Sequence, residues 1–137
     1  MLFMADVFSV EKRSEVMSKI RSKNTLIERK VFRYLRKNNI YFQKHYDRAP
    51  GKPDIALPRK RKAVFVDGDF WHGHDYNKRR KKLSPYWKLK ILTNIKRDRK
   101  NRNLLKQQGW KVLEIWELDL EKREEQTLNK ILHFLMV

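Results

Sequence analysis

The sequence predicts a single α/β domain in which a short central sheet of about four strands is sandwiched between helices. Three observations support this fold class. Apolar residues recur at helical spacing near both ends of the chain, and two short apolar runs lie on either side of a basic turn in the middle. No change of composition marks a domain boundary, so we expect the 137 residues to form a single domain with one modest core.

The N-terminal part of the chain is expected to hold two helices. The first twenty or so residues have the pattern of a basic helical arm, and residues 21–24 are expected to interrupt it. Thr25 and Glu28 then have the spacing of a capping box, which predicts the start of a second helix. We therefore expect an N-terminal arm at residues 1–23 and a core at residues 24–137.

The middle of the chain is expected to supply three strands. Residues 40–45 alternate well enough for a strand, and the apolar runs at residues 55–57 and 63–66 predict a β-hairpin. Asp54 stands just before the first hairpin strand, and Asp67 ends the second. If these strands pair, both acidic side chains approach the same edge of the sheet.

The C-terminal part is expected to hold a long basic helix, a strand and a closing helix. Ser84 and Pro85 have the character of an N-cap and first helical residue, so residues 86–107 should be helical until Gly109 ends them. Residues 110–116 are rich in strand-forming types. Apolar residues at helical spacing then predict the closing helix: Leu128, Ile131 and Leu135.

The charge balance indicates a polyanionic partner. The chain has 34 Lys and Arg against 16 Asp and Glu, a formal net charge of +18. Binding to nucleic acid phosphates would relieve this self-repulsion. An anionic membrane surface is the rival, but no helix sets its basic residues opposite a large apolar face. With no cysteine and no signal-peptide pattern, we expect a cytoplasmic, nucleoid-associated protein without disulfides or thiolate metal sites.

Three acidic residues are candidates for phosphodiester hydrolysis, which uses carboxylates to bind a divalent metal ion. They are Glu28, Asp54 and Asp67. Pro53-Asp54 followed by Asp67 is similar to a common nuclease pattern, although Asp69 occupies the place where that pattern has a lysine. The capping box could by itself explain Glu28, and a turn with Gly68 could explain Asp67.

Several separated motifs give the sequence a resemblance to the very short patch repair (Vsr) DNA mismatch endonucleases. The loop Phe70-Trp-His-Gly-His74, preceded by Val64-Phe-Val-Asp-Gly68, is similar to the signature of that family. Other segments match in the same order between residues 5 and 118: Ala5-Asp-Val7, Thr25-Leu-Ile-Glu28, Pro50-Gly-Lys-Pro-Asp54, Arg97-Asp98 and Gly109-Trp-Lys-Val112.

The resemblance implies a restriction-endonuclease-like three-layer sandwich with a short mixed sheet. It also implies a Mg²⁺-dependent enzyme that nicks one strand of duplex DNA beside a T·G mismatch and leaves a 5′ phosphate and a 3′ hydroxyl. By the same resemblance, Asp54 would bind the metal ion together with the backbone carbonyl of Val66, and His72 would be the general base. Glu28 would be a supporting acid, and the role of Asp67 stays open.

The resemblance also implies DNA contacts and one departure from the family. Met17, Phe70 and Trp71 are similar to residues wedged between base pairs. Lys90 and Asn94 match positions that face DNA bases. Family members often hold a structural zinc ion, but here the corresponding positions predict no structural zinc: Asp69, His74, Tyr76 and Leu118.

Two alternatives stay open at this point. One is a non-catalytic architectural protein that binds DNA, and the other is a restriction-like nuclease that cuts both strands. We expect a monomer acting on mismatched double-stranded DNA, with a functional link to a cytosine methyltransferase.

Overall fold

A computed structural model describes residues 10–69, 73, 74 and 76–137. Within these residues, four strands form one sheet in the order β1-β2-β3-β4. The strands are β1 (Gln43–Lys44), β2 (Ile55–Leu57), β3 (Lys62–Asp67) and β4 (Lys111–Trp116). The β1–β2 and β2–β3 pairs are antiparallel, whereas the β3–β4 pair is parallel. The predicted α/β class with a short mixed sheet is confirmed.

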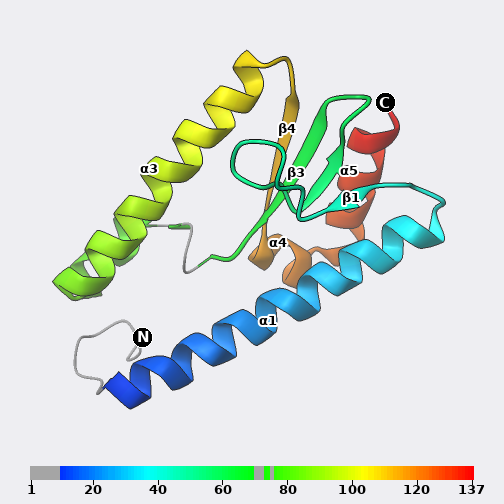
Figure 1. Cartoon of the computed structure of the whole chain (residues 1–137). Helices are drawn as coiled ribbons and strands as arrows, with labels where there is room; N and C mark the ends of the chain where they lie inside the picture. The colour runs from blue at the N-terminus through cyan, green and yellow to red at the C-terminus, as the bar shows by residue number, and fades with distance from the viewer. Residues whose placement is uncertain (1–9, 70–72, 75) are drawn as a thin grey trace.

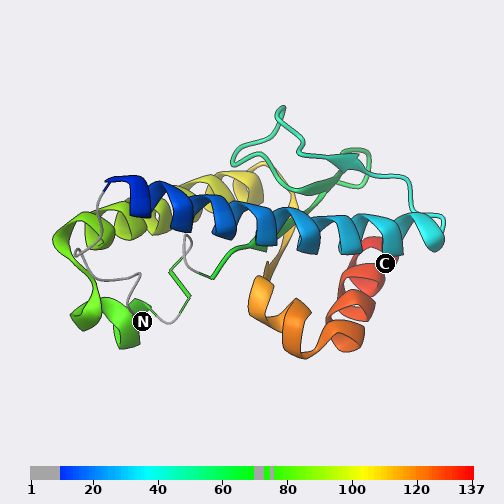
Figure 2. The same ribbon diagram turned by 90° about the horizontal axis from the view of Figure 1, so that it is seen from below.

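Helices cover both faces of this sheet (Figures 1 and 2). α1 (Val10–Lys37), the short α4 (Glu117–Lys122) and α5 (Glu124–Met136) pack on one face. α3 (Pro85–Gln107) packs on the other. Side chains of β3 alternate accordingly, with Val64 in the core shared with α1 and α5, and Ala63 and Phe65 in the core beneath α3. The result is a three-layer sandwich.

The hairpin and the long basic helix form where the sequence predicts them. Ile55 pairs with Val64 in the β2–β3 hairpin. α2 (Tyr76–Arg79) and the short helix η2 (Arg80–Lys82) precede α3, which begins at the Ser84 cap and supplies the crossover that a parallel β3–β4 pair requires. After α3 the chain turns at Gly109, whose φ of 87° a side chain would disfavour.

The expected interruption at residues 21–24 is wrong, because α1 is one continuous helix through this segment. The segment contains Ser22 and Asn24, which lower helix propensity by only about 0.5 kcal/mol each, and it has neither Gly nor Pro. Such a cost is too small to end a helix whose C-terminal half is anchored by the buried residues Val31 and Leu35.

Two other boundaries differ from expectation. The strand expected at residues 40–45 is reduced to the two residues of β1, because His45 leaves the extended conformation with a φ of 48°. The closing helix is divided into α4 and α5 at Arg123, which has non-helical backbone angles. No helix in the described ranges is both long enough and apolar enough to cross a membrane.

Candidate active site

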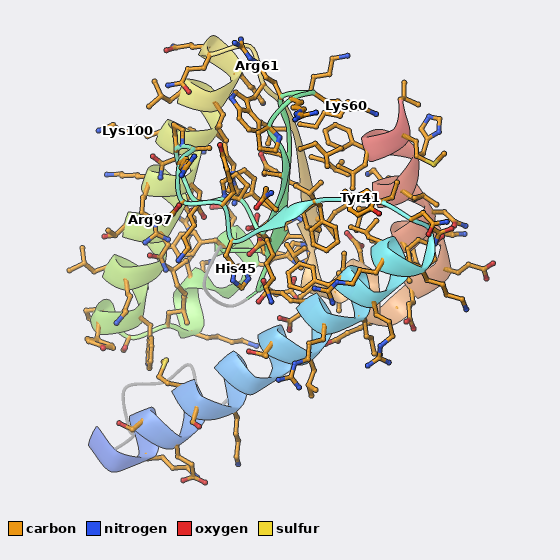
Figure 3. The ribbon with its side chains drawn as sticks, turned by 45° about the vertical axis from the view of Figure 1, so that its right-hand side comes forward. Tyr41, His45, Lys60, Arg61, Arg97 and Lys100 are labelled. Atoms are coloured by element: carbon orange, nitrogen blue, oxygen red, sulfur yellow. The ribbon has the colours of Figure 1, made fainter. Side chains whose placement is uncertain are left out.

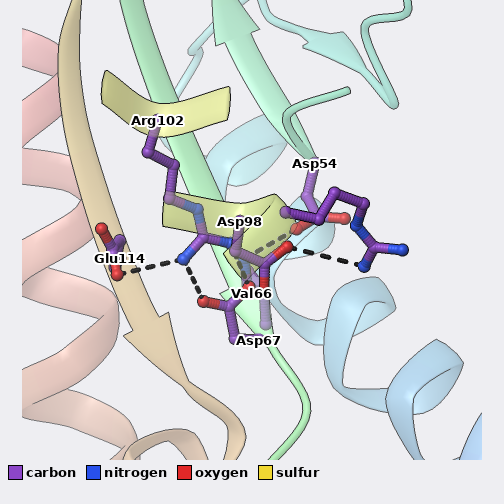
Figure 4. A network of polar contacts seen from close by, with 7 residues as sticks. Asp54, Val66, Asp67, Asp98, Arg102 and Glu114 are labelled. Carbon is purple, nitrogen blue, oxygen red and sulfur yellow. Dashed lines mark hydrogen bonds and ion pairs between the residues drawn. The ribbon is translucent and has the colours of Figure 1, made fainter. Parts of the chain in front are cut away.

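Asp54 stands where the chain enters β2, beside the end of β3. The antiparallel register that pairs Ile55 with Val64 brings Asp54 next to Val66. The Oδ2 atom of Asp54 accepts a hydrogen bond of 2.7 Å from the backbone N–H of Val66 (Figure 4). One carboxylate oxygen is therefore held by the main chain of the neighbouring strand, which fixes the direction of the side chain.

Glu28 and His45 complete a cluster around Asp54. Glu28 comes from α1, and its Oε2 lies 2.7 Å from the Nε2 of His45, which follows β1. One ligand atom from each of the three side chains lies within 4.8 Å of the other two. α1 begins at Val10, fifteen residues before Thr25, so Glu28 does not stand at a helix start. The capping-box explanation for Glu28 therefore no longer applies.

His45 was not identified by sequence reasoning. Its hydrogen-bond partner Glu28 lies 17 residues away, and this spacing matches no ligand motif. The sequence offers one weak signal, the place of His45 at the end of a predicted strand. The structure shows that its backbone lies in the left-handed region. The backbone N–H of His45 donates to the carbonyl of Asp54 over 3.0 Å, so the main chain keeps the two residues together.

Charge is poorly balanced around Asp54. Burial raises the pKa of Asp54 well above its ordinary value of 3.8, and the Glu28 carboxylate raises it further. The hydrogen bond from Val66 N–H opposes this change, while Asp67 adds a smaller increase. Two carboxylates that repel one another are stabilised by a shared cation. Two carboxylates and one imidazole are donors that suit a divalent metal ion, so these residues could hold one.

Asp67 ends β3 as expected, but its carboxylate faces an arginine. The side chain is buried, and its two oxygens accept hydrogen bonds of 2.7 Å each from Arg102 of α3. Arg102 also lies 3.0 Å from Glu114 of β4 (Figure 4). Its guanidinium stacks over the Phe65 ring at 4.2 Å. The sequence did not predict this role of Arg102, because the residue is 35 positions away from Asp67. A catalytic role for Asp67 stays a prediction, as does a metal contact from the Val66 carbonyl.

Two grooves reach the cluster from opposite sides of the sheet. A cavity of about 480 Å³ on the α3 side is lined by Asp54, Asp67, Arg97, Asp98, Asn101 and Arg102. A cavity of about 510 Å³ on the α1 side is lined by Glu28, Arg29, Arg33, Arg36, Lys44 and His45. Figure 3 shows His45 near α1, with Arg97 and Lys100 on α3. Asp98 forms an ion pair with Arg97 at 3.6 Å. The basic side chains of both grooves are suited to phosphate groups.

The predicted DNA-contacting residues have different surroundings. Met17 is partly buried against a cluster formed by Leu83, Trp87 and Ile91. Lys90 is exposed on α3, with its Nζ 5.8 Å from the centre of the Tyr86 ring. Asn94 follows one turn later and is partly buried. Three predicted site residues lie outside the described residues: Phe70, Trp71 and His72.

A small polar contact joins some of the positions at which the resemblance predicts no structural zinc ion. His74 Nδ1 lies 3.2 Å from Asp69 Oδ1, and the His74 ring stacks on Trp116 at 4.5 Å. The same Asp69 oxygen accepts a hydrogen bond of 3.4 Å from the backbone N–H of Leu118. These contacts attach the segment after β3 to the end of β4.

Comparisons with known proteins agree with one another. A family model described as DNA mismatch endonuclease Vsr matches residues 5–78. The type II nicking enzyme V.NmeAIP of Neisseria meningitidis is 39% identical over 132 residues, which cover 93% of this chain and 94% of that protein. The type II nicking enzyme V.XorIIP of Xanthomonas oryzae is 38% identical over 85% of this chain and 88% of that protein. The DNA mismatch endonuclease Vsr of Escherichia coli is 34% identical over 90% of this chain and 81% of that protein.

Proposed function

The chain belongs to the DNA mismatch endonuclease Vsr family, and on this premise we propose that it nicks one strand of duplex DNA beside a T·G mismatch in very short patch repair. The observation that supports this proposal best is the Glu28, His45 and Asp54 cluster at the meeting point of two grooves, of which the one on the α1 side is predominantly basic. Arginine and lysine side chains in these grooves can hold the DNA backbone while the acidic cluster faces one phosphodiester.

Glu28 and Asp54 would hold the divalent cation of this reaction, which we take to be Mg²⁺, together with the backbone carbonyl of Val66. Two hard carboxylates near one another support this assignment. When bound, such a cation neutralises charge that develops on the phosphate and makes a bound water more acidic. The hydrogen bond from Val66 N–H to Asp54 orients one of these carboxylates before any ligand arrives.

The other steps would fall to the protein's own side chains. We propose that an imidazole nitrogen of His72 takes the proton from the attacking water, so that the product has a 5′ phosphate and a 3′ hydroxyl. The support for His72 is its place in the Phe70–His74 segment, which is similar to the family signature. Basic groups in the groove beneath α3, such as Arg97, would neutralise the phosphate.

DNA would lie against α1 and α3. In this proposal Met17, Phe70 and Trp71 enter the base stack beside the mismatch, where a T·G pair unstacks at low cost. Lys90 and Asn94, one turn apart on α3, would contact bases. A single nick needs a single active site, which is in keeping with a monomer. A functional link to a cytosine methyltransferase is proposed from the family resemblance.

Strand cleavage of a labelled duplex with one T·G mismatch tests the function. It is compared with a fully paired duplex, in Mg²⁺ and in EDTA, for the wild type and for Asp54→Ala. We expect a Mg²⁺-dependent nick in one strand of the mismatched duplex, slowed about 1000-fold in the variant, a barrier change of about 4 kcal/mol. Glu121→Gln, an exposed change on α4, serves as the control and should nick at the wild-type rate.

Two results would contradict the proposal. Tight binding without cleavage in any divalent cation would indicate an architectural protein. Cleavage of both strands of the paired duplex would indicate a restriction-like nuclease.

A further inference from the structure

We propose that His45 is a nitrogen ligand of the cation shared by Glu28 and Asp54, and that it shifts the preference of this site from Mg²⁺ toward transition-metal cations such as Co²⁺. The inference rests on the proposed function, because it concerns the same metal site. It adds a ligand that comes from neither the hairpin nor α1, and a cation selectivity that follows from its chemistry.

The placement of His45 is fixed by the main chain. Its N–H donates to the Asp54 carbonyl over 3.0 Å, and the next N–H, that of Tyr46, donates to the Pro53 carbonyl over 2.9 Å. These two bonds tie the chain after β1 to the chain before β2. The His45 ring also meets the Phe32 ring edge-on, with 5.8 Å between centres, which limits the directions in which its Nε2 can point.

The spacing of the polar atoms matches a coordination shell. Neighbouring ligands of a cation with bonds of about 2.1 Å are about 3.0 Å apart, and opposite ligands are about 4.2 Å apart. The 2.7 Å between His45 Nε2 and Glu28 Oε2 is close to the first value. The atoms of all three side chains fall within 4.8 Å, so small side-chain movements would complete the shell. Without a cation, the hydrogen bond between His45 and Glu28 keeps two ligands side by side.

Access and charge also favour a cation at this point. The His45 side chain is 47% exposed, so its nitrogen can be reached from the groove lined by Glu28 and Arg29. Asp54 lines the groove on the other face of the sheet. Two carboxylates neutralise a divalent cation, and an imidazole adds a third donor without adding charge.

The chemistry of the third donor sets the selectivity. Mg²⁺ prefers oxygen ligands and releases its waters reluctantly, so an imidazole adds little to its binding. Co²⁺ and later transition metals bind imidazole nitrogen well. A site with Glu28, Asp54 and His45 should therefore bind Co²⁺ much more tightly than an all-oxygen site would, while its affinity for Mg²⁺ depends mainly on the two carboxylates.

Calorimetric titration of the full chain with Co²⁺ and separately with Mg²⁺, without DNA, tests this inference. His45→Gln replaces the nitrogen by an amide that can still donate a hydrogen bond to Glu28. We expect its Co²⁺ affinity to fall by about 10-fold or more, its Mg²⁺ affinity to change by less than about 3-fold, and the visible absorption of bound Co²⁺ to change. His133→Gln, an exposed substitution on α5, should bind both ions as the wild type does.

The outcomes separate this inference from the proposed function. Equal weakening of both ions in His45→Gln would mean that His45 only positions Glu28, and no weakening of either would remove it from the site; both results overturn the inference. In either case, nicking of the mismatched duplex by the wild type would leave the proposed function standing. If the wild type bound both cations as expected but did not nick the mismatched duplex, the result would contradict the proposed function alone.

Discussion

Asp54 and Asp67 stand at adjacent ends of the β2–β3 hairpin, yet their surroundings are opposite. Asp54 has a second carboxylate, that of Glu28, as its neighbour, and its pKa is raised by burial and by that charge. Asp67 is more deeply buried and has both oxygens bonded to Arg102. Among the described residues, the same residue type therefore has no hydrogen-bonded cationic partner at one strand end and has one at the other. The difference supports the proposal that Asp54 binds a cation, whereas the ion pair of Asp67 connects β3 to α3.

The largest effect should come from removing the guanidinium group of Arg102, which compensates the charge of Asp67. Arg102→Met retains much of the side-chain volume but leaves the Asp67 carboxylate buried without its partner, so we expect a loss of about 3 kcal/mol in the free energy of unfolding. Urea denaturation monitored by tryptophan fluorescence measures it. The double variant Asp67→Asn with Arg102→Met should recover a large part of this loss. If the double variant were as unstable as Arg102→Met alone, the unpaired charge of Asp67 would not be the cause.

A smaller effect of opposite sign is expected at Asp54. Because the pKa of Asp54 is raised in the folded state, its contribution to stability is fully present below its ordinary value of 3.8 and is lost as pH rises through the folded value. Asp54→Asn should therefore unfold at a temperature a few degrees higher than the wild type at about pH 8 in EDTA, and at nearly the same temperature at about pH 3.5.

Thermal denaturation across this pH range measures the difference between the two proteins. The difference should shrink when a divalent cation is added to the wild type, since the cation supplies the missing compensation. A variant less stable than the wild type at about pH 8 would contradict the assignment of Asp54 as an uncompensated charge.

The smallest effect should come from Glu114, the second acidic partner of Arg102. Its side chain is 45% exposed, so solvent screens its ion pair with Arg102. Glu114→Gln should cost about 0.5 kcal/mol or less in the same urea experiment. A loss as large as that of Arg102→Met would show that Glu114, rather than Asp67, is the main partner of the arginine.

Local patterns predicted the parts of the fold that depend on neighbouring residues. The hairpin followed from two apolar runs around a basic turn, and α3 followed from Ser84 and Pro85. The interruption of α1 was predicted wrongly because Ser22 and Asn24 are poor helix formers without being helix breakers. Propensity over four residues could not show that packing at Val31 and Leu35 secures the helix that contains them.

The residues of the candidate site also differ in whether a local sequence pattern could identify them. Asp54 and Glu28 were found because they belong to recognisable segments, Pro53-Asp54 and Thr25-Leu-Ile-Glu28. His45 and Arg102 were missed because each acts through a partner far along the chain, and a sequence shows such proximity only once the strands and helices are assembled. The resemblance to a family supplied roles for positions that it shares with that family, and it said nothing about these two.

The continuity of α1 has a mechanical consequence. Met17 and Glu28 are eleven residues apart on one uninterrupted helix, a separation of roughly 16 Å along its axis. Figures 1 and 2 show this helix as a single straight rod along the edge of the molecule. Because no break in the helix separates the two residues, a displacement of α1 near Met17 would also displace the Glu28 carboxylate, whereas the buried residues Val31 and Leu35 hold the next turns of the helix in the core.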